Sequence, residues 1–135
     1  MELVSTNDEV ANKARGEVEI VLKGRTLKMR PTHQFLAEIE SLRGMGVMAI
    51  VQRFLTRNYG FADVVDIVWA GLKAGGLQVR RDKVAELVFE TGITAPASAA
   101  IELLSNALGF ADAKTDDNDA EGDDGPEGEG DAANG

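Results

Sequence analysis

Two short stretches near the start of the chain alternate polar and apolar residues. Residues 17–22 alternate acidic and apolar side chains before continuing apolar, and residues 25–30 alternate around Leu27 and Met29. Such alternation places successive side chains on opposite faces of a strand. Lys23 and Gly24, which separate the two stretches, form a turn signal. The pattern predicts an early β-hairpin.

After Pro31, which cannot donate a hydrogen bond to a sheet, the apolar residues follow a helical period. Thr32 is a suitable N-cap for a helix over about residues 33–43, in which Phe35, Leu36, Ile39 and Leu42 share one side. Glycines then divide the rest of the chain into similar segments. Four further helices are predicted, from 47 to just before Tyr59, from 61 to 74, from about 82 to 91, and from about 94 to 108.

The predicted fold is therefore α+β and mostly α, with an N-terminal hairpin followed by about five short helices. Residues 15–109 form the single predicted domain. Residues 110–135 carry ten acidic residues against Lys114 alone, which leaves −9, the formal charge of the whole chain. Because this segment has almost no aromatic or β-branched residues to bury, we expect a disordered acidic tail. Residues 1–14 lack periodicity, and we expect a disordered arm there as well.

The residue types that carry catalysis are sparse. The chain has no cysteine and one histidine, His33, and no serine lies in a nucleophile elbow. Glu38 and Glu40 point to different sides of their helix. Asp63 and Asp66 share a face, and we interpret both pairs as a solvated face or as acids at a helix start. The sequence predicts a non-enzymatic protein without metal or cofactor.

Two segments imitate ligand-binding motifs. Residues 44–49 match G-x-G-x-x-A, but the pattern joins two predicted helices where a dinucleotide loop would follow a strand. We interpret it as a linker. Residues 117–128 resemble the first half of a calcium loop, yet the twelfth position is Gly128 and Pro126 falls inside. Tight calcium binding is not expected.

A basic cluster suggests one alternative function. Arg80, Arg81 and Lys83 lie between the third and fourth predicted helices, where a helix-turn-helix protein contacts phosphate. However, a formally neutral domain with a polyanionic tail would gain little from counterion release. A small DNA-binding regulator therefore stays an alternative, and no nucleic-acid partner is expected.

Six segments follow one another in a recognisable order, namely Arg15–Glu19, Leu22–Arg25, Leu27–Thr32, Ala37–Glu40, Ala70–Gly76 and Val84–Gly92. This succession resembles the small tail-assembly proteins encoded by gene transfer agents and related tailed phages. The resemblance covers approximately Arg15 to Gly109, and its motifs are not chemically diagnostic.

The resemblance implies a tail assembly chaperone that binds the tape-measure protein and helps the tail-tube protein to assemble, and the chain could also self-associate. Exposed helical side chains would make such contacts, and we expect them at Met45, Val47, Met48, Arg53 and Arg57. Packing of the apolar ones into the core is the competing interpretation. The main alternative function is a structural tail component retained in the particle. Without a signal peptide or an apolar run of membrane length, we expect a cytoplasmic protein in a bacterial host.

Overall fold

The computed structural model describes residues 15–110 and begins with the predicted hairpin. Strands β1 (Val18–Leu22) and β2 (Arg25–Met29) pair antiparallel, with Ile20 opposite Leu27. Lys23 and Gly24 both have positive φ, 52° and 80°, as a two-residue type I′ turn requires. The alternation then directs one face of the hairpin inward, and the buried residues are Val18, Ile20, Leu22, Leu27 and Met29.

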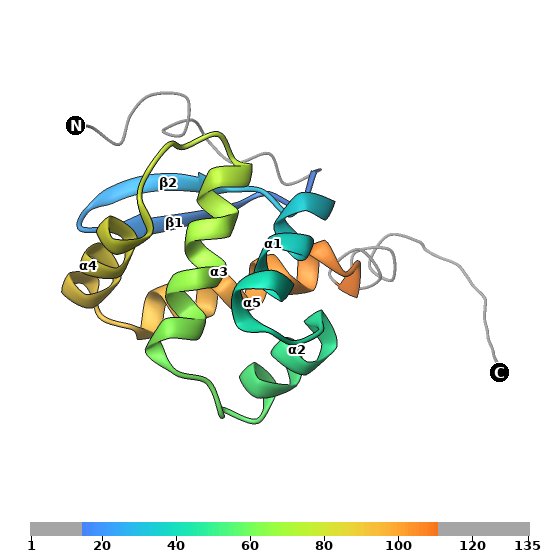
Figure 1. Cartoon of the computed structure of the whole chain (residues 1–135). Helices are drawn as coiled ribbons and strands as arrows, with labels where there is room; N and C mark the ends of the chain where they lie inside the picture. Colours follow the sequence, from blue (N-terminus) through green and yellow to red (C-terminus); the bar gives the residue numbers. More distant parts are fainter. Residues whose placement is uncertain (1–14, 111–135) are drawn as a thin grey trace, which may run out of the picture.

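Five helices follow, as the sequence predicts, and the fold class is confirmed (Figure 1). They are α1 (His33–Arg43), α2 (Val47–Leu55), α3 (Phe61–Ala74), α4 (Arg81–Thr91) and α5 (Thr94–Ala107). Thr32 caps α1 by accepting a hydrogen bond from the Phe35 backbone N–H at 3.0 Å. The G-x-G-x-x-A segment begins in the linker between α1 and α2, so a helix and not a strand directly precedes it. The disorder predicted for residues 1–14 and for the tail beyond Phe110, like the calcium-like segment, lies outside the described residues.

Helix α3 is the centre of the molecule. It packs against α1, α4, α5 and β2, and Figure 1 shows it crossing between the hairpin and the surrounding helices. Its apolar face is wide because Val64, Val65, Ile67 and Val68 are all fully buried. A helix that is apolar on most sides must be covered on most sides, which explains its position.

Gly71 allows α3 to approach its neighbours closely. A Cβ atom at this position would lie 2.6 Å from Leu103 Cδ2 and 3.1 Å from Met29 Cβ. The Gly71 carbonyl also accepts a hydrogen bond from the Arg30 backbone N–H at 3.1 Å. Any side chain at residue 71 would therefore push α3 away from both α5 and β2.

We expect Gly71→Ala to destabilise the fold even though alanine favours helices more than glycine does. Overpacking of this kind costs about 1 to 3 kcal/mol, and thermal denaturation followed by circular dichroism would measure it. Leu103→Ala should make room for the added methyl group. The cost of Gly71→Ala should therefore be smaller in that background, and equal costs in both backgrounds would show that Leu103 is not the obstacle.

Candidate functional site

Two buried carboxylates on α3 bind three arginines from three other elements. Asp66 accepts hydrogen bonds from Arg43 at the end of α1 and from Arg81 at the start of α4. Asp63 accepts from Arg53 of α2 at 2.7 Å and lies 2.8 Å from Arg43 Nε. Asp63 and Asp66 are only 3% and 2% exposed. The network therefore connects α3 with α1, α2 and α4.

Asp63 also caps its own helix. Its Oδ2 atom accepts a hydrogen bond from the Gly60 backbone N–H at 2.7 Å, so the prediction of a helix-start acid is confirmed for this residue. Burial opposes its ionisation. The hydrogen bonds from Arg53 and Gly60 and the charges of Arg43 and Arg53 outweigh that effect and lower the pKa of Asp63 below its ordinary value.

The interpretation of Asp63 and Asp66 as a solvated face was wrong. Both side chains point into the protein because the arginines that satisfy them come from distant parts of the sequence, which no local pattern reveals. Burial lowers the pKa of Arg43, but the hydrogen bonds and charges of Asp66 and Asp63 raise it overall. Each carboxylate is bound by two arginine side chains from other elements. This arrangement stabilises the fold and offers no free acid or base.

The five predicted contact residues separate into three groups. Met45 and Val47 are half-buried and pack against the core. Arg53 is engaged by Asp63 within the network. Met48 and Arg57 point to solvent, Met48 being 58% exposed. The structure therefore leaves Met48 and Arg57 available to a partner, whereas the other three have contacts inside the domain.

An apolar hollow lies between α2 and the end of α5, and we call it the α2–α5 hollow. Its volume is about 80 Å³. Leu55 stands at this site with 68% of its surface exposed, and Phe110 is also exposed. The sequence stripe of α2 did not reveal this feature, since the partner residues come from α5 and from Phe110 beyond it. The apolar lining consists of Val51, Phe54, Leu55, Ile101, Leu104 and Phe110.

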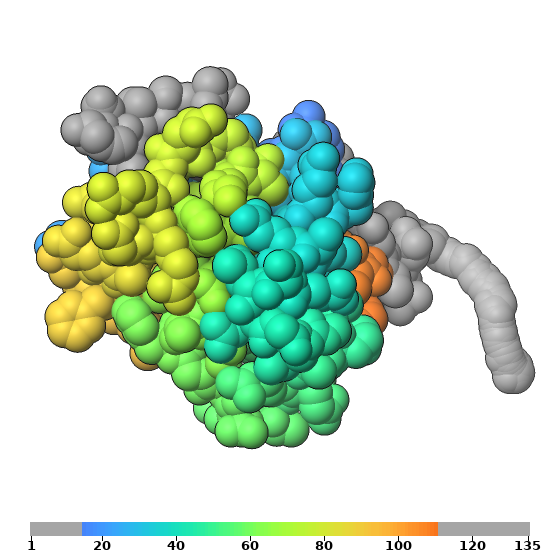
Figure 2. All heavy atoms as spheres, in the orientation of Figure 1, coloured from blue at the N-terminus to red at the C-terminus, as the bar shows by residue number. Residues whose placement is uncertain are grey.

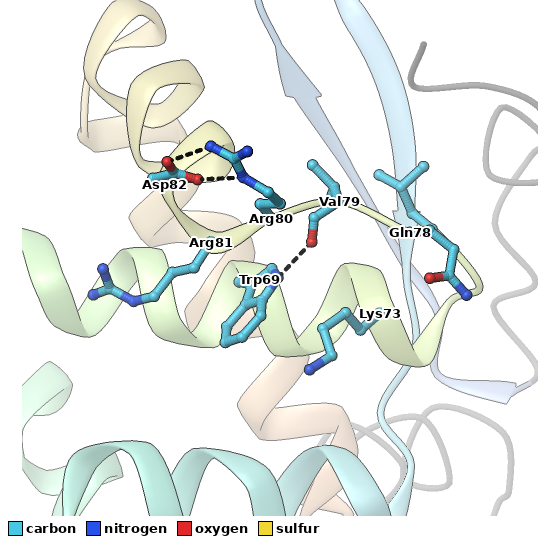
Figure 3. A pocket seen from close by; sticks show the side chains of 8 residues that line it. Trp69, Lys73, Gln78, Val79, Arg80, Arg81 and Asp82 are labelled. Carbon is cyan, nitrogen blue, oxygen red and sulfur yellow. Dashed lines mark hydrogen bonds and ion pairs between the residues drawn. The ribbon is translucent and has the colours of Figure 1, made fainter. Parts of the chain in front are cut away.

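A larger hollow of about 690 Å³ adjoins the loop between α3 and α4 (Figure 3). Trp69 donates a hydrogen bond from its indole N–H to the Val79 carbonyl at 2.8 Å, which holds the loop against α3. Lys73 lies 4.0 Å from the centre of the Trp69 ring and pairs with Glu38 at 2.6 Å. The charged groups that line this site are therefore already paired, Arg80 with Asp82, Lys73 with Glu38 and Arg81 with Asp66.

The basic cluster that suggested DNA binding is neutralised by neighbouring acids. Arg80 pairs with Asp82 at 2.7 Å, and Figure 3 shows this bidentate contact. Arg81 belongs to the buried network, and Lys83 lies 3.7 Å from Glu86. These contacts leave no concentrated positive surface at the start of α4.

The part of the chain that the structure describes has few side chains that could bind a ligand. His33 is exposed in the first turn of α1. Within residues 15–110, no three His, Cys, Asp or Glu side chains gather closely enough to hold a metal ion. No helix in that range has the length and apolar character needed to cross a membrane.

Comparison with known proteins places this domain among phage tail proteins. The family described as "Phage tail tube protein, GTA-gp10" matches residues 15–110, which is the whole of the described fold. The chain belongs to this family. No curated protein and no solved structure gives a significant match. The tail and gene-transfer-agent context expected from the sequence resemblance is thereby confirmed.

The family corrects the functional prediction. A tail tube protein is a structural component, so the expected role of tail assembly chaperone was wrong, and the finding favours the structural alternative. The resemblance pointed to the right group of tail genes. It named the wrong role because its segments describe a fold and contain no residue specific to chaperone action.

Proposed function

We propose that this chain is a structural subunit of a phage or gene-transfer-agent tail, and that copies of it assemble into the tail tube. The family match over residues 15–110 carries the proposal, since it covers every helix and strand described. The surface also suits repeated self-contact. Large apolar side chains remain exposed on α2 and α4, where a monomer would gain nothing by leaving them in water.

The internal polar groups agree with a structural role. Asp63 and Asp66 are paired with arginines, and the charged side chains that line the hollow beside Trp69 are paired with acids or bases as well. A subunit that bears load in a polymer benefits from such cross-links between helices. None of these groups is placed to act on a substrate.

The composition of purified tails tests this function. A tube subunit should be present in many copies per particle, and antibody labelling should decorate the length of the tail. Deletion of the gene should yield particles without tails, and expression of the full chain in trans should restore them. Absence of the protein from purified, intact tails would reject the proposal.

We extend the proposal to one further partner, the tape-measure protein that was predicted from the sequence. A tube is hollow, so a subunit that lines it meets whatever the lumen contains. Crosslinking of purified tails followed by mass spectrometry should then recover links between this chain and the tape-measure protein. Links only between copies of this chain would remove the tape-measure protein from the proposal and leave the tube assignment standing.

A further inference from the structure

Phe89 is the most solvent-exposed of the large apolar side chains in the described part of the chain. It lies on α4 and is 77% exposed, whereas Val84, Leu87 and Val88 of the same helix are buried in the core. Ile93, which follows the end of α4 and precedes α5, is also exposed. The core of this domain is complete without Phe89. Its ring is therefore free to fill a cavity on another molecule.

The α2–α5 hollow has the complementary shape and chemistry. Its lining is apolar, its volume of about 80 Å³ suits one side chain rather than a helix, and Leu55 extends the apolar surface beyond its rim. Burying an aromatic ring among aliphatic side chains is the type of contact that dominates protein interfaces. The single projecting ring of Phe89 is an aromatic group of the size that such a hollow would accept.

The two features lie on different sides of the molecule. Helix α4 packs against α3, α5 and β1, whereas α2 packs against α1 and α5. Figure 2 shows α4, in gold, at one edge and α1 and α2, in cyan to green, at the other. Phe89 therefore cannot reach the hollow of its own chain. A contact between such unlike surfaces of two copies is head-to-tail, and head-to-tail contacts generate rings or helical filaments.

Charge complementarity supports a second copy as the occupant. Phe89 lies between Glu86 and Glu90, whose ion pairs with Lys83 and Lys23 are long, at 3.7 and 4.0 Å. Arg57 follows the hollow-lining Leu55 by two residues and makes no ion pair with any residue in 15–110. Docking of α4 beside the C-terminal end of α2 would bring Glu86 and Glu90 of one copy near Arg57 of the next, and such opposite charges favour a correct orientation.

The chain's own C-terminal segment does not suit the hollow. Apart from Pro126, residues 111–135 contain no apolar side chain larger than alanine, and ten of these residues are acidic, so the segment offers little to bury there. The segment 1–14 contains Leu3, Val4 and Val10 and is the remaining internal occupant. The experiment below separates it from a second copy.

We propose that Phe89 of one copy docks into the α2–α5 hollow of the next copy, and that this is the lateral contact of the tail tube. The inference rests on the proposed function, because a tube requires a repeated contact between identical subunits. It deepens that function by naming the two surfaces. Arg57, which was predicted from the sequence as a contact residue, follows the C-terminal end of α2 and would face Glu86 and Glu90 of the neighbouring copy in this contact.

Two single substitutions test the contact in the full-length protein. Phe89→Asp removes the projecting ring, and Leu55→Asp places a charge at the hollow. Both positions are mostly exposed, so circular dichroism should show an intact fold. We expect each variant to remain monomeric in analytical ultracentrifugation at concentrations where the wild-type chain assembles, with a contact dissociation constant raised about thirtyfold or more. Val21→Glu, at an exposed apolar position of β1 that belongs neither to α4 nor to the lining of the hollow, should assemble like the wild type.

Mixing the two variants gives the decisive result. Phe89→Asp retains its hollow and Leu55→Asp retains its ring, so the mixture should form one intact contact and stop at a 1:1 dimer. Two variants that stay monomeric when mixed, or Phe89→Asp chains that assemble normally, would overturn the contact. Loss of assembly on deletion of residues 1–14, with Phe89→Asp unaffected, would make the N-terminal segment the occupant instead.

Failure of the proposed function has a different signature. A wild-type chain that stays monomeric and is absent from purified tails would reject the tube assignment, and the docking contact with it. A wild-type chain that is abundant in tails while Phe89→Asp complements the gene deletion fully would reject only the docking contact.

Discussion

Replacing Asp66 with asparagine is expected to lower the free energy of unfolding by about 3 to 5 kcal/mol. Asp66 is almost fully buried and accepts hydrogen bonds from both Arg43 and Arg81. Asparagine has one oxygen, so its NH₂ group would face one of the two guanidinium groups and place donor against donor. The substitution would also leave two cations without their shared counter-charge. Urea denaturation at neutral pH would measure the loss.

Asp82→Asn provides the matched control for Asp66. Asp82 pairs with Arg80 on the surface, where water screens both charges, so its replacement should change stability little. An Asp66→Asn variant within about 0.5 kcal/mol of the wild type, which is the usual range for neutral surface changes, would show that the network does not hold α1 and α4 to α3.

Replacing Asp63 with asparagine should cost about 3 kcal/mol at neutral pH, near the lower end for a broken buried pair because Arg53 is partly exposed. Asparagine can still accept the hydrogen bond from the Gly60 backbone N–H. The loss therefore comes from the charge that holds Arg43 and Arg53, and the helix cap is preserved.

The cost of Asp63→Asn should also depend on pH. Because folding lowers the pKa of Asp63, the unfolded chain binds this proton more readily. The stabilisation that ionised Asp63 gives to the fold is fully present above the ordinary aspartate pKa of about 3.9. This stabilisation is lost as the pH falls through the lower pKa that Asp63 has in the folded state. The wild-type and Asp63→Asn stabilities should therefore converge below about pH 4. Parallel stability curves from pH 7 to pH 2 would contradict the assignment.

Local patterns predicted most of the secondary structure. The Lys23-Gly24 turn, the Thr32 cap and the glycines between helices are short-range signals. Most observed boundaries differ from the predicted ones by only a residue or so, as in α4, which begins at Arg81 where the sequence suggested Asp82. The end of α2 differs more, since the helix stops at Leu55 and the prediction extended it to just before Tyr59. The candidate surfaces were harder to predict. Met48 and Arg57 are exposed as expected, but Arg53 is occupied by Asp63, which lies ten residues away.

The sequence by itself determined the elements and the family, because turns, caps and periodicity depend on neighbouring residues and the family match follows from their order. The tertiary structure alone decided which charges are buried and which apolar residues are left over. In the sequence, Asp63 and Asp66 resemble surface acids. In the folded domain they are buried, because Arg43, Arg53 and Arg81 of other helices pair with them. Phe89 resembles its buried neighbours in the sequence, and only the packing of α4 against α3 leaves it in solvent, since a helix in contact on one side must expose the other.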